Sequence, residues 1–315
     1  MLRRLRNVVL DPGTVPRYLN NKCKLLHLRY RERHNRGVFS IDIHCRNGFF
    51  AQLTWCLYIF AYCDERSLIP HVVLTSPNYV NPLVGPDWFQ YFFEQYEPDC
   101  VAENVVTTVR IRRLQDLGLP TRCFADMTIE RAARLAQKYL AVRPEIAETV
   151  DVFTGDHFAG RVLGVHYRGT DKTEAPRVSY EQATSAVRAH LERDPDVGCL
   201  FVATDEAAFL DHVKAEGVGV PICCCDDLRS SSAMAIHKAT FAGDPYRKGR
   251  EALVNALLLA RCDHVIRTTS ALSAWASIFN PQLPVTLLNE PYKERCWFPD
   301  RAIVERARQS GAPHR

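Results

Sequence analysis

The stretch RVLGVHYRGTDKTE, residues 161–174, begins as an apolar run and ends in a cluster of charged side chains. An apolar run of this length, followed by a glycine, is typical of a strand inside a parallel sheet. Side chains alternate along a strand, so His166 and Arg168 face the same side of it. We therefore predict a buried strand over residues 161–168, with an imidazole and a guanidinium side by side at its carboxyl end.

The rest of the second half alternates strands with helices, which is the order expected of a parallel Rossmann-like sheet. Ser179 and Gln182 form a capping-box pattern, which predicts a helix near residues 180–193. Further strands are expected over 198–204, 220–225, 264–267 and 284–288, with helices over 250–262 and around Trp275.

The first half predicts another α/β unit. A strand over 38–44, a turn at Gly48, an apolar helix over 49–66 and a strand over 68–75 follow one another, and helical patterns return around 127–150. The aromatic loop over 76–98 has two interpretations: core packing, which we favour, and the lining of a sugar site. The domain boundaries that follow from this pattern are 1–37, 38–155 and 156–315.

Residues 1–37 are strongly basic, with ten Lys or Arg against only Asp11 and Glu32. Residues 18–36 fit a basic amphipathic helix. This helix would either contact an anionic membrane surface or form a solvated or packed extension, and the sequence leaves both open. Nucleic-acid binding is not expected, because basic and aromatic residues do not interleave along the body of the chain. No apolar run reaches the ~18 residues that span a bilayer.

The twelve cysteines are scattered, and three of them are adjacent, at positions 223–225. This usage favours a reduced, intracellular setting over a disulfide framework. No cysteine or histidine spacing is typical of a zinc site, so we expect no structural metal.

Polar residues follow the expected strands of the second half at their carboxyl ends. In open α/β sheets this edge binds ligands, although some of these residues will simply cap the next helix; Asp205, for instance, is well placed to start one. The residues are Arg168, Asp171, Asp205, Asp226, Asp227, Thr268, Thr269, Ser270 and Asn289.

The chemistry of this edge suits a phosphorylated ligand. An arginine fork binds a diphosphate, and Thr268–Ser270 directly precede a helix whose N-terminus favours an anion. The chain has no P-loop, no GxGxxG after a strand and no GxSxG elbow. Asp171 or Glu174 is placed to take a proton from a hydroxyl, and a structural salt-bridge cluster is the alternative.

Four blocks of the sequence resemble, in the same order, those of the α-1,6-fucosyltransferases and the rhizobial nodulation fucosyltransferases. The resemblance covers most of residues 40–290 and implies a GT-B fold, in which two Rossmann-like domains with parallel sheets face a cleft. It also implies an inverting, metal-independent transfer from a GDP-sugar, with residues 38–155 on the acceptor side and 156–315 binding the nucleotide sugar. The blocks are NGFFAQLTWCLYIFAYCDERSLIP (47–70), GVHYRGTDKTE (164–174), LFVATDEAAFL (200–210) and REALVNALLLARCDHVIRTTSALS (250–273).

The resemblance also implies roles for single residues. Arg168 matches the arginine that holds the β-phosphate, and His166 matches the histidine that approaches guanine. Glu174 matches the proposed base, beside Lys172 on the acceptor side, with Asp171 as the alternative base. The remaining nucleotide-sugar residues that we expect are Gly48, Asp205, Thr269 and Ser270.

Two positions depart from the family pattern. Gly169 stands where the family has a second arginine, so Arg247 or Arg250 would compensate. Asn255 stands where the family has an aspartate that pairs with guanine. Three readings remain open: Glu251 takes over, guanine is held differently, or the donor is not a GDP-sugar.

These features together predict a glycosyltransferase that moves fucose, or a related sugar, from a GDP-sugar to a glycan hydroxyl in polysaccharide or glycolipid assembly. We expect no cofactor or metal, and a cytoplasmic location with peripheral membrane contact through residues 1–37. The alternatives are a transferase of the same fold with another nucleotide sugar, and a non-catalytic nucleotide- or glycan-binding protein.

Overall fold

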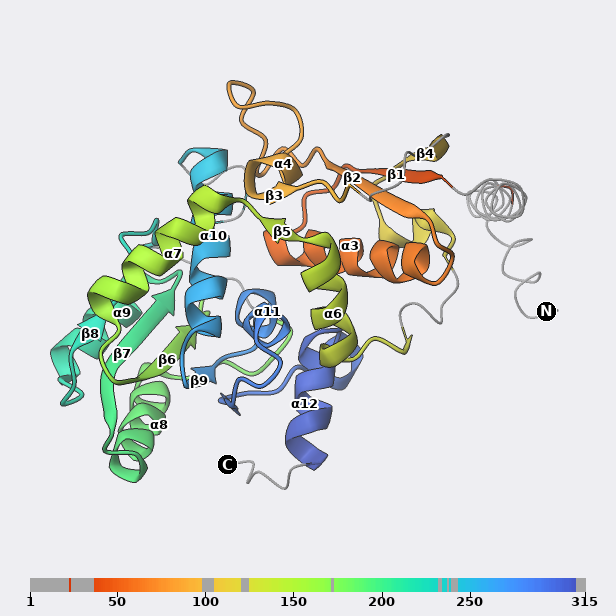
Figure 1. Cartoon of the computed structure of the whole chain (residues 1–315). Coiled ribbons are helices and arrows are strands. Elements are labelled where there is room, and N and C mark those ends of the chain that lie inside the picture. The colour runs from red at the N-terminus through yellow and green to blue at the C-terminus, as the bar shows by residue number, and fades with distance from the viewer. Residues whose placement is uncertain are drawn as a thin grey trace.

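The computed structural model describes residue 23 and residues 37–97, 105–119, 125–170, 173–231, 234–236, 238 and 243–309. Two parallel sheets, one from each half of the chain, are each flanked by helices (Figure 1). This arrangement confirms the predicted GT-B class. The proposed amphipathic segment, residues 18–36, lies outside the described residues except for Cys23. Within the described part of the chain, no helix is both long and apolar enough to cross a membrane.

The first sheet has the order β2-β1-β4, from strands Ile69–Leu74, Val38–Ile43 and Val105–Ile111. Helix α3 (Phe49–Asp64) follows β1 and is buried on nearly all sides, as expected of a helix that is apolar all round. The predicted helix and its two neighbouring strands are thus confirmed. Strand β4 is not among the predicted strands, although its run VVTTVRI is rich in the β-branched residues that favour one.

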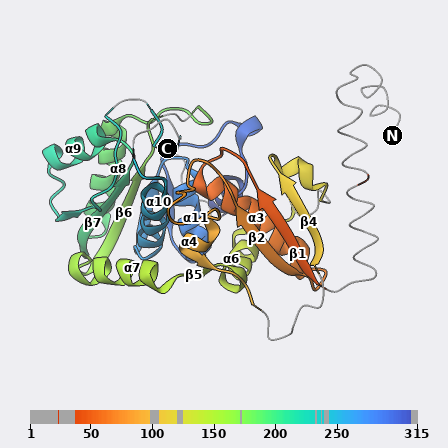
Figure 2. The ribbon, with the colours of Figure 1, turned by 90° about the horizontal axis from the view of Figure 1, so that it is seen from above.

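The second sheet has five parallel strands in the order β10-β9-β6-β7-β8. All five match predicted strands, although β7 begins one residue earlier than expected and β8 is shorter. Figure 2 shows the two sheets on opposite sides of the ribbon, with helices between them. The strands are β6 (Arg161–Tyr167), β7 (Val197–Thr204), β8 (Ile222–Cys223), β9 (His264–Arg267) and β10 (Val285–Leu287).

Helices cover both faces of the second sheet. Helices α8 (Tyr180–Arg193) and α9 (Ala207–Glu216) pack with the strands in one apolar cluster. Helices α10 (Pro245–Ala260) and α11 (Ala271–Phe279) belong to the larger cluster that also contains the first sheet. The predicted capping box starts α8: Ser179 Oγ accepts from the Gln182 amide at 3.2 Å, and Gln182 Oε1 accepts from the Ser179 amide at 2.8 Å.

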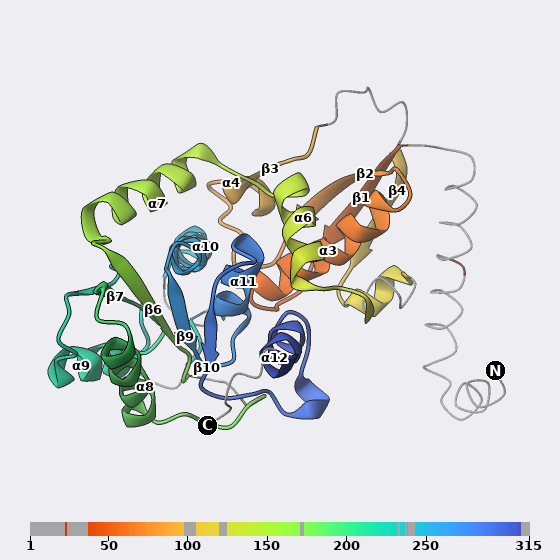
Figure 3. The ribbon, with the colours of Figure 1, turned by 60° about the horizontal axis from the view of Figure 1, so that its bottom comes forward.

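Two helices link the halves of the chain. Helix α6 (Ile129–Tyr139) contacts α3 and α11, whereas α7 (Pro144–His157) packs on α10. Figure 3 shows α10 and α11 between the second sheet and the pair α3 and α6. A final helix, α12 (Asp300–Gln309), packs against α11.

Helix α11 ties the halves together through Trp275, which is 0% exposed. Its indole Nε1 donates to Thr54 Oγ1 of α3 at 3.0 Å, and its ring lies 5.5 Å from that of Phe50. On α10, Gly249 lies so close to Phe92 that a Cβ there would come within 2.8 Å of the ring. The halves therefore share one core.

The aromatic loop contributes to this core. The loop contains the short helix α4 (Phe89–Phe92) and the strand β3 (Phe93–Glu94). Strand β3 pairs with β5 (Ala141–Val142). Trp88 and its aromatic neighbours up to Phe93 are buried, which confirms the core-packing interpretation over a sugar site.

Candidate active site

An open pocket lies at the carboxyl ends of β6 and β7. This is the edge where the sequence predicts a ligand. Helices α10 and α11 and the segment after β8 form further walls, and Tyr79 reaches it from the first half. Its polar lining residues are Tyr79, His166, Arg168, Thr204, Asp205, Asp227, Lys248, Glu251 and Asn255.

The opening stretch of the sequence supplies His166 and Arg168 to the same pocket wall, as the strand alternation predicts. Tyr167, between them, faces the other side and stacks on Phe209 with ring centroids 4.2 Å apart. The Arg168 amide donates to Thr268 Oγ1 at 2.8 Å, which fixes the end of the strand against that of β9.

The guanidinium of Arg168 is held in place by Asp205. Arg168 Nε lies 3.1 Å from Asp205 Oδ2, and the Arg168 side chain is 19% exposed. The same carboxylate oxygen accepts from Thr170 Oγ1 at 2.7 Å. The expectation that Asp205 starts the next helix is wrong, because Glu206 occupies the N-cap of α9. Asp205 instead positions the arginine.

Lys248 is a second cation of the pocket, and sequence reasoning missed it. It is 5% exposed, its Nζ donates to the carbonyl of Lys238 at 3.2 Å, and burial lowers its pKa. Lys248 and Asn255 are seven residues apart on α10, so helical periodicity puts both on one face. That periodicity is the signal by which the sequence could have identified Lys248.

The two arginines expected to compensate for Gly169 lie elsewhere. Arg247 pairs with Glu251 and donates to the carbonyl of Asp226, and its side chain is outside the pocket lining. Arg250 reaches α7 and donates to Thr149 Oγ1 at 2.9 Å. The structure therefore brings Lys248, and neither arginine, together with Arg168.

Gly169 itself is explained by a neighbour. A Cβ at this position would overlap the carboxylate of Glu206. Glu206 is buried, and its Oε2 accepts from the Tyr180 hydroxyl at 2.8 Å. The position is thus reserved for glycine by packing against an anchored carboxylate.

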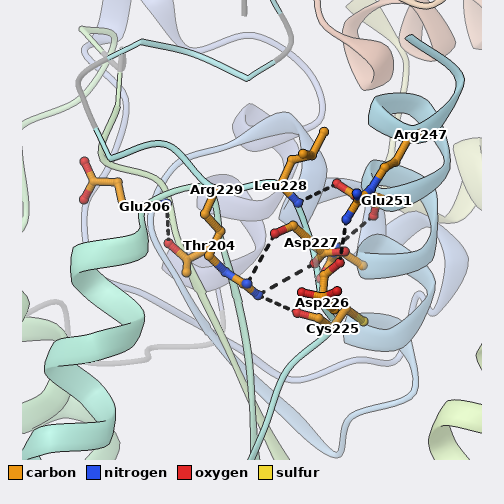
Figure 4. Close-up of polar contacts among 10 residues, drawn as sticks. Thr204, Glu206, Cys225, Asp226, Asp227, Leu228, Arg229, Arg247 and Glu251 are labelled. Carbon is orange, nitrogen blue, oxygen red and sulfur yellow. Dashed lines mark hydrogen bonds and ion pairs between the residues drawn. The ribbon is translucent and has the colours of Figure 1, made fainter. Parts of the chain in front are cut away.

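Glu251 of α10 and Asp227 of the segment after β8 lie close together (Figure 4). Asn255 joins them in a polar cluster. Glu251 receives Arg247 on one oxygen and the Leu228 amide, at 2.9 Å, on the other. Asn255 Nδ2 donates to Asp227 Oδ2 at 2.7 Å and to the Glu251 carbonyl at 2.8 Å. Burial is the main reason that the pKa of Asp227 rises to about 6.

Other expected residues lie near the pocket without lining it. Thr269 and Ser270 are buried at the start of α11, and the Thr269 amide donates to Asn289 Oδ1 at 2.7 Å. Gly48 is the N-cap of α3, one residue before Phe49, whose amide donates to the hydroxyl of the pocket residue Tyr79 at 2.7 Å.

The acceptor-side residues are less fully placed. Glu174 Oε2 accepts from the Thr173 amide at 3.2 Å, and its carbonyl accepts from the Tyr292 amide at 2.7 Å. Glu174 does not line the pocket. Asp171 and Lys172 lie outside the described residues. Their catalytic roles stay predictions.

Comparison with known proteins finds several relatives. The "Nodulation protein Z" of Bradyrhizobium diazoefficiens (strain JCM 10833 / BCRC 13528 / IAM 13628 / NBRC 14792 / USDA 110) is 28% identical over 181 residues, which cover 51% of this chain and 46% of that protein. The chain thus matches about half the length of this curated relative.

Solved structures are also similar. A NodZ α-1,6-fucosyltransferase soaked with GDP-fucose is 18% identical, with 77% of this chain and 93% of that one covered and a TM-score of 0.49. POFUT1 in complex with GDP-fucose is 12% identical, with 78% and 97% covered and a TM-score of 0.48. The family model described as Nodulation protein Z (NodZ) matches residues 119–301. Because this match spans more than half of the sequence, the chain belongs to the NodZ family.

Proposed function

We propose that the protein is a glycosyltransferase that moves fucose, or a related sugar, from a GDP-sugar to a glycan hydroxyl in polysaccharide or glycolipid assembly. Membership of the NodZ family supports the reaction class, since one NodZ protein is described as an α-1,6-fucosyltransferase and was soaked with GDP-fucose. The observation that carries the proposal is the convergence of Arg168 and Lys248 in one pocket at the ligand-binding edge of the second sheet.

The two cations suit the charge that develops during sugar transfer. As the bond between the anomeric carbon and the β-phosphate oxygen breaks, negative charge builds on the diphosphate, and fixed cations stabilise it. Arg168 is held by Asp205 and Lys248 is almost fully buried, so neither has to reorganise much when the charge develops. We propose that these side chains do this work without a divalent metal. Undiminished turnover in EDTA would support this, and a strict requirement for Mg²⁺ or Mn²⁺ would contradict it.

The acceptor hydroxyl needs a base. In the proposed step its oxygen attacks the anomeric carbon from the side opposite the diphosphate, GDP leaves with the bonding electron pair, and the proton passes to a carboxylate. Glu174 is the first candidate for this base and Asp171 the second. The product is inverted at the anomeric carbon, which nuclear magnetic resonance of the product tests directly; retention of configuration would contradict the mechanism.

The central test is transfer from GDP-fucose to a panel of oligosaccharide acceptors by the full chain. Arg168→Ala is expected to lower the rate by roughly 10²–10³-fold, the usual loss when a group that stabilises transition-state charge is removed. Arg188→Ala is the matched control, because this arginine pairs with Glu216, and neither residue lines the pocket. Equal activity of the Arg168 variant and the control would refute the role of Arg168. Nucleotide titration with GDP, UDP and CDP separates the alternative donors.

We also propose a cytoplasmic protein that touches the membrane peripherally through residues 1–37, whose ten basic residues suit anionic lipid. Co-sedimentation with phosphatidylserine/phosphatidylcholine vesicles, but not with pure phosphatidylcholine, is the expected result. Equal binding to both, or none, would contradict it.

A further inference from the structure

Asp227 and Asn255 are a second polar element of the pocket, apart from its two cations. The Nδ2 atom of Asn255 donates both to Asp227 Oδ2 and to the carbonyl of Glu251, at 2.7 and 2.8 Å. An amide nitrogen has two N–H donors, and both have acceptors here. The orientation of the amide is therefore fixed by its surroundings.

This orientation leaves the carbonyl oxygen of Asn255 as an acceptor. The side chain is only 7% exposed, and its Oδ1 atom has no hydrogen-bond partner within the described part of the chain. A buried carbonyl oxygen without a donor is unfavourable and rare in folded proteins. Because Asn255 lines the pocket, a ligand bound there is a suitable source of the missing donor.

Asp227 has the matching character. Its side chain is 10% exposed. Arg229 Nη2 lies 4.0 Å from Asp227 Oδ2 and donates instead to the carbonyl of Cys225 at 2.7 Å. The charge of Asp227 is thus only partly balanced by the protein. Glu251 differs, because an amide and the side chain of Arg247 occupy its two oxygens.

We infer that Asp227 and Asn255 read the base of the nucleotide, and that as two neighbouring acceptors they select guanine. This inference rests on the proposed function and assigns base specificity within its site. Guanine presents two adjacent donors on one edge, the ring N1–H and the 2-amino group. Uracil presents one N–H between two carbonyls, and adenine and cytosine each place an amino group beside a ring acceptor. Only the guanine edge satisfies two acceptors side by side.

The presence of Asp227 also explains the amide at position 255. A second carboxylate within 2.7 Å of Asp227 would repel it, and one of the two would take up a proton. With an amide at 255, the carboxylate that the resemblance expects on α10 is supplied from the segment after β8. Of the three readings that the sequence leaves open at Asn255, the geometry favours guanine held differently over replacement by Glu251.

The test compares GDP with inosine diphosphate, which lacks only the 2-amino group of guanine. Calorimetric titration of the full chain at pH 7.5 should give at least about tenfold tighter binding of GDP, because one donor to a charged or buried acceptor is lost in the analogue. Asp227→Asn should weaken GDP binding by roughly 10- to 100-fold and bring the two affinities close together.

Asp226→Asn is the matched control: it makes the same change of charge one residue earlier, on an exposed side chain outside the pocket lining. It should keep both the affinity for GDP and the discrimination. Asn255→Ala, which removes the second acceptor, should reduce the discrimination without adding charge.

The outcomes separate this inference from the proposed function. If Asp227→Asn keeps the wild-type ratio of the GDP and inosine diphosphate affinities, the inference is wrong and the proposed function stands. If the wild-type chain prefers UDP or CDP, or binds no nucleotide, both are wrong. If the Asp227 variant does not fold, the wild-type ratio decides, and a ratio near one overturns the inference.

Discussion

Replacing Lys248 by methionine removes a charge from the pocket and keeps most of the side-chain volume. We expect this variant to bind GDP more weakly by about 1.5–3 kcal/mol, the usual value of a hydrogen bond to a charged group, which is roughly a 10- to 150-fold rise in Kd. Guanosine, which lacks phosphate, should lose little affinity. The loss should therefore depend on the diphosphate.

The same variant should fold at least nearly as well as the wild type. Burial lowers the pKa of Lys248, so its charged form destabilises the folded state. This free-energy cost is present at neutral pH and disappears once the pH exceeds the pKa of the lysine in the unfolded chain. The lost hydrogen bond to the Lys238 carbonyl is worth about 1 kcal/mol in the other direction. We therefore expect a change in Tm of only a few degrees.

The assay is calorimetric titration with GDP, GMP and guanosine, together with thermal unfolding, on Lys248→Met. Arg188→Met is the control, because Arg188 pairs with Glu216 and neither residue lines the pocket. An equal loss for GDP and guanosine would refute the placement of Lys248 beside the diphosphate. So would an unchanged Kd for GDP, or an equal effect of the two variants.

Three further predictions concern Gly169, Trp275 and Asp227. Gly169→Ala forces the Glu206 carboxylate to move, so the free energy of unfolding in urea should fall by about 1–3 kcal/mol; no change would show that this carboxylate yields freely. Trp275→Phe removes the hydrogen bond to Thr54 and leaves a small cavity, which should lower the free energy of unfolding by about 1–3 kcal/mol. An unchanged free energy of unfolding would show that this contact does not stabilise the packing of the two halves. The ratio of GDP affinity to inosine diphosphate affinity should fall between pH 7.5 and pH 5.0. Asp227, with a pKa of about 6, becomes protonated in this range and loses an acceptor, while the phosphates of the two nucleotides titrate alike. A constant ratio would exclude Asp227 as the group that reads the base. The titratable and polar groups that interact with Asp227 are Asn255, Glu251, Arg229, Arg247 and Cys225.

The second sheet and its ligand edge could be predicted because their signals are local. The capping box at Ser179 and the alternation that pairs His166 with Arg168 both depend on neighbours within a few residues. The partners of these groups depend on packing instead. Asn255 meets Asp227 across 28 positions, and Tyr79 enters the pocket from the other half of the chain.

The choice between basic residues shows the same limit. The sequence places Arg247, Lys248 and Arg250 in one short run, and charge alone does not distinguish them. Which of them enters the pocket depends on the rotation of α10 about its axis, and Phe92 against Gly249 helps to fix that rotation. Helical periodicity from Asn255 narrows the choice once the inward face is known.

The hydrogen bond between Trp275 and Thr54 has a consequence for recombination between relatives. A chimera that joins the first half of one NodZ protein to the second half of another at the α7 linker would keep each sheet intact. The chimera would still bury the indole N–H of Trp275 where the two halves pack together. Its acceptor, Thr54, lies 221 positions away in the chain and would come from the other parent. Where the other parent has no hydroxyl at position 54, the N–H loses its partner, and the two halves would have to be exchanged together with the residues that meet α11.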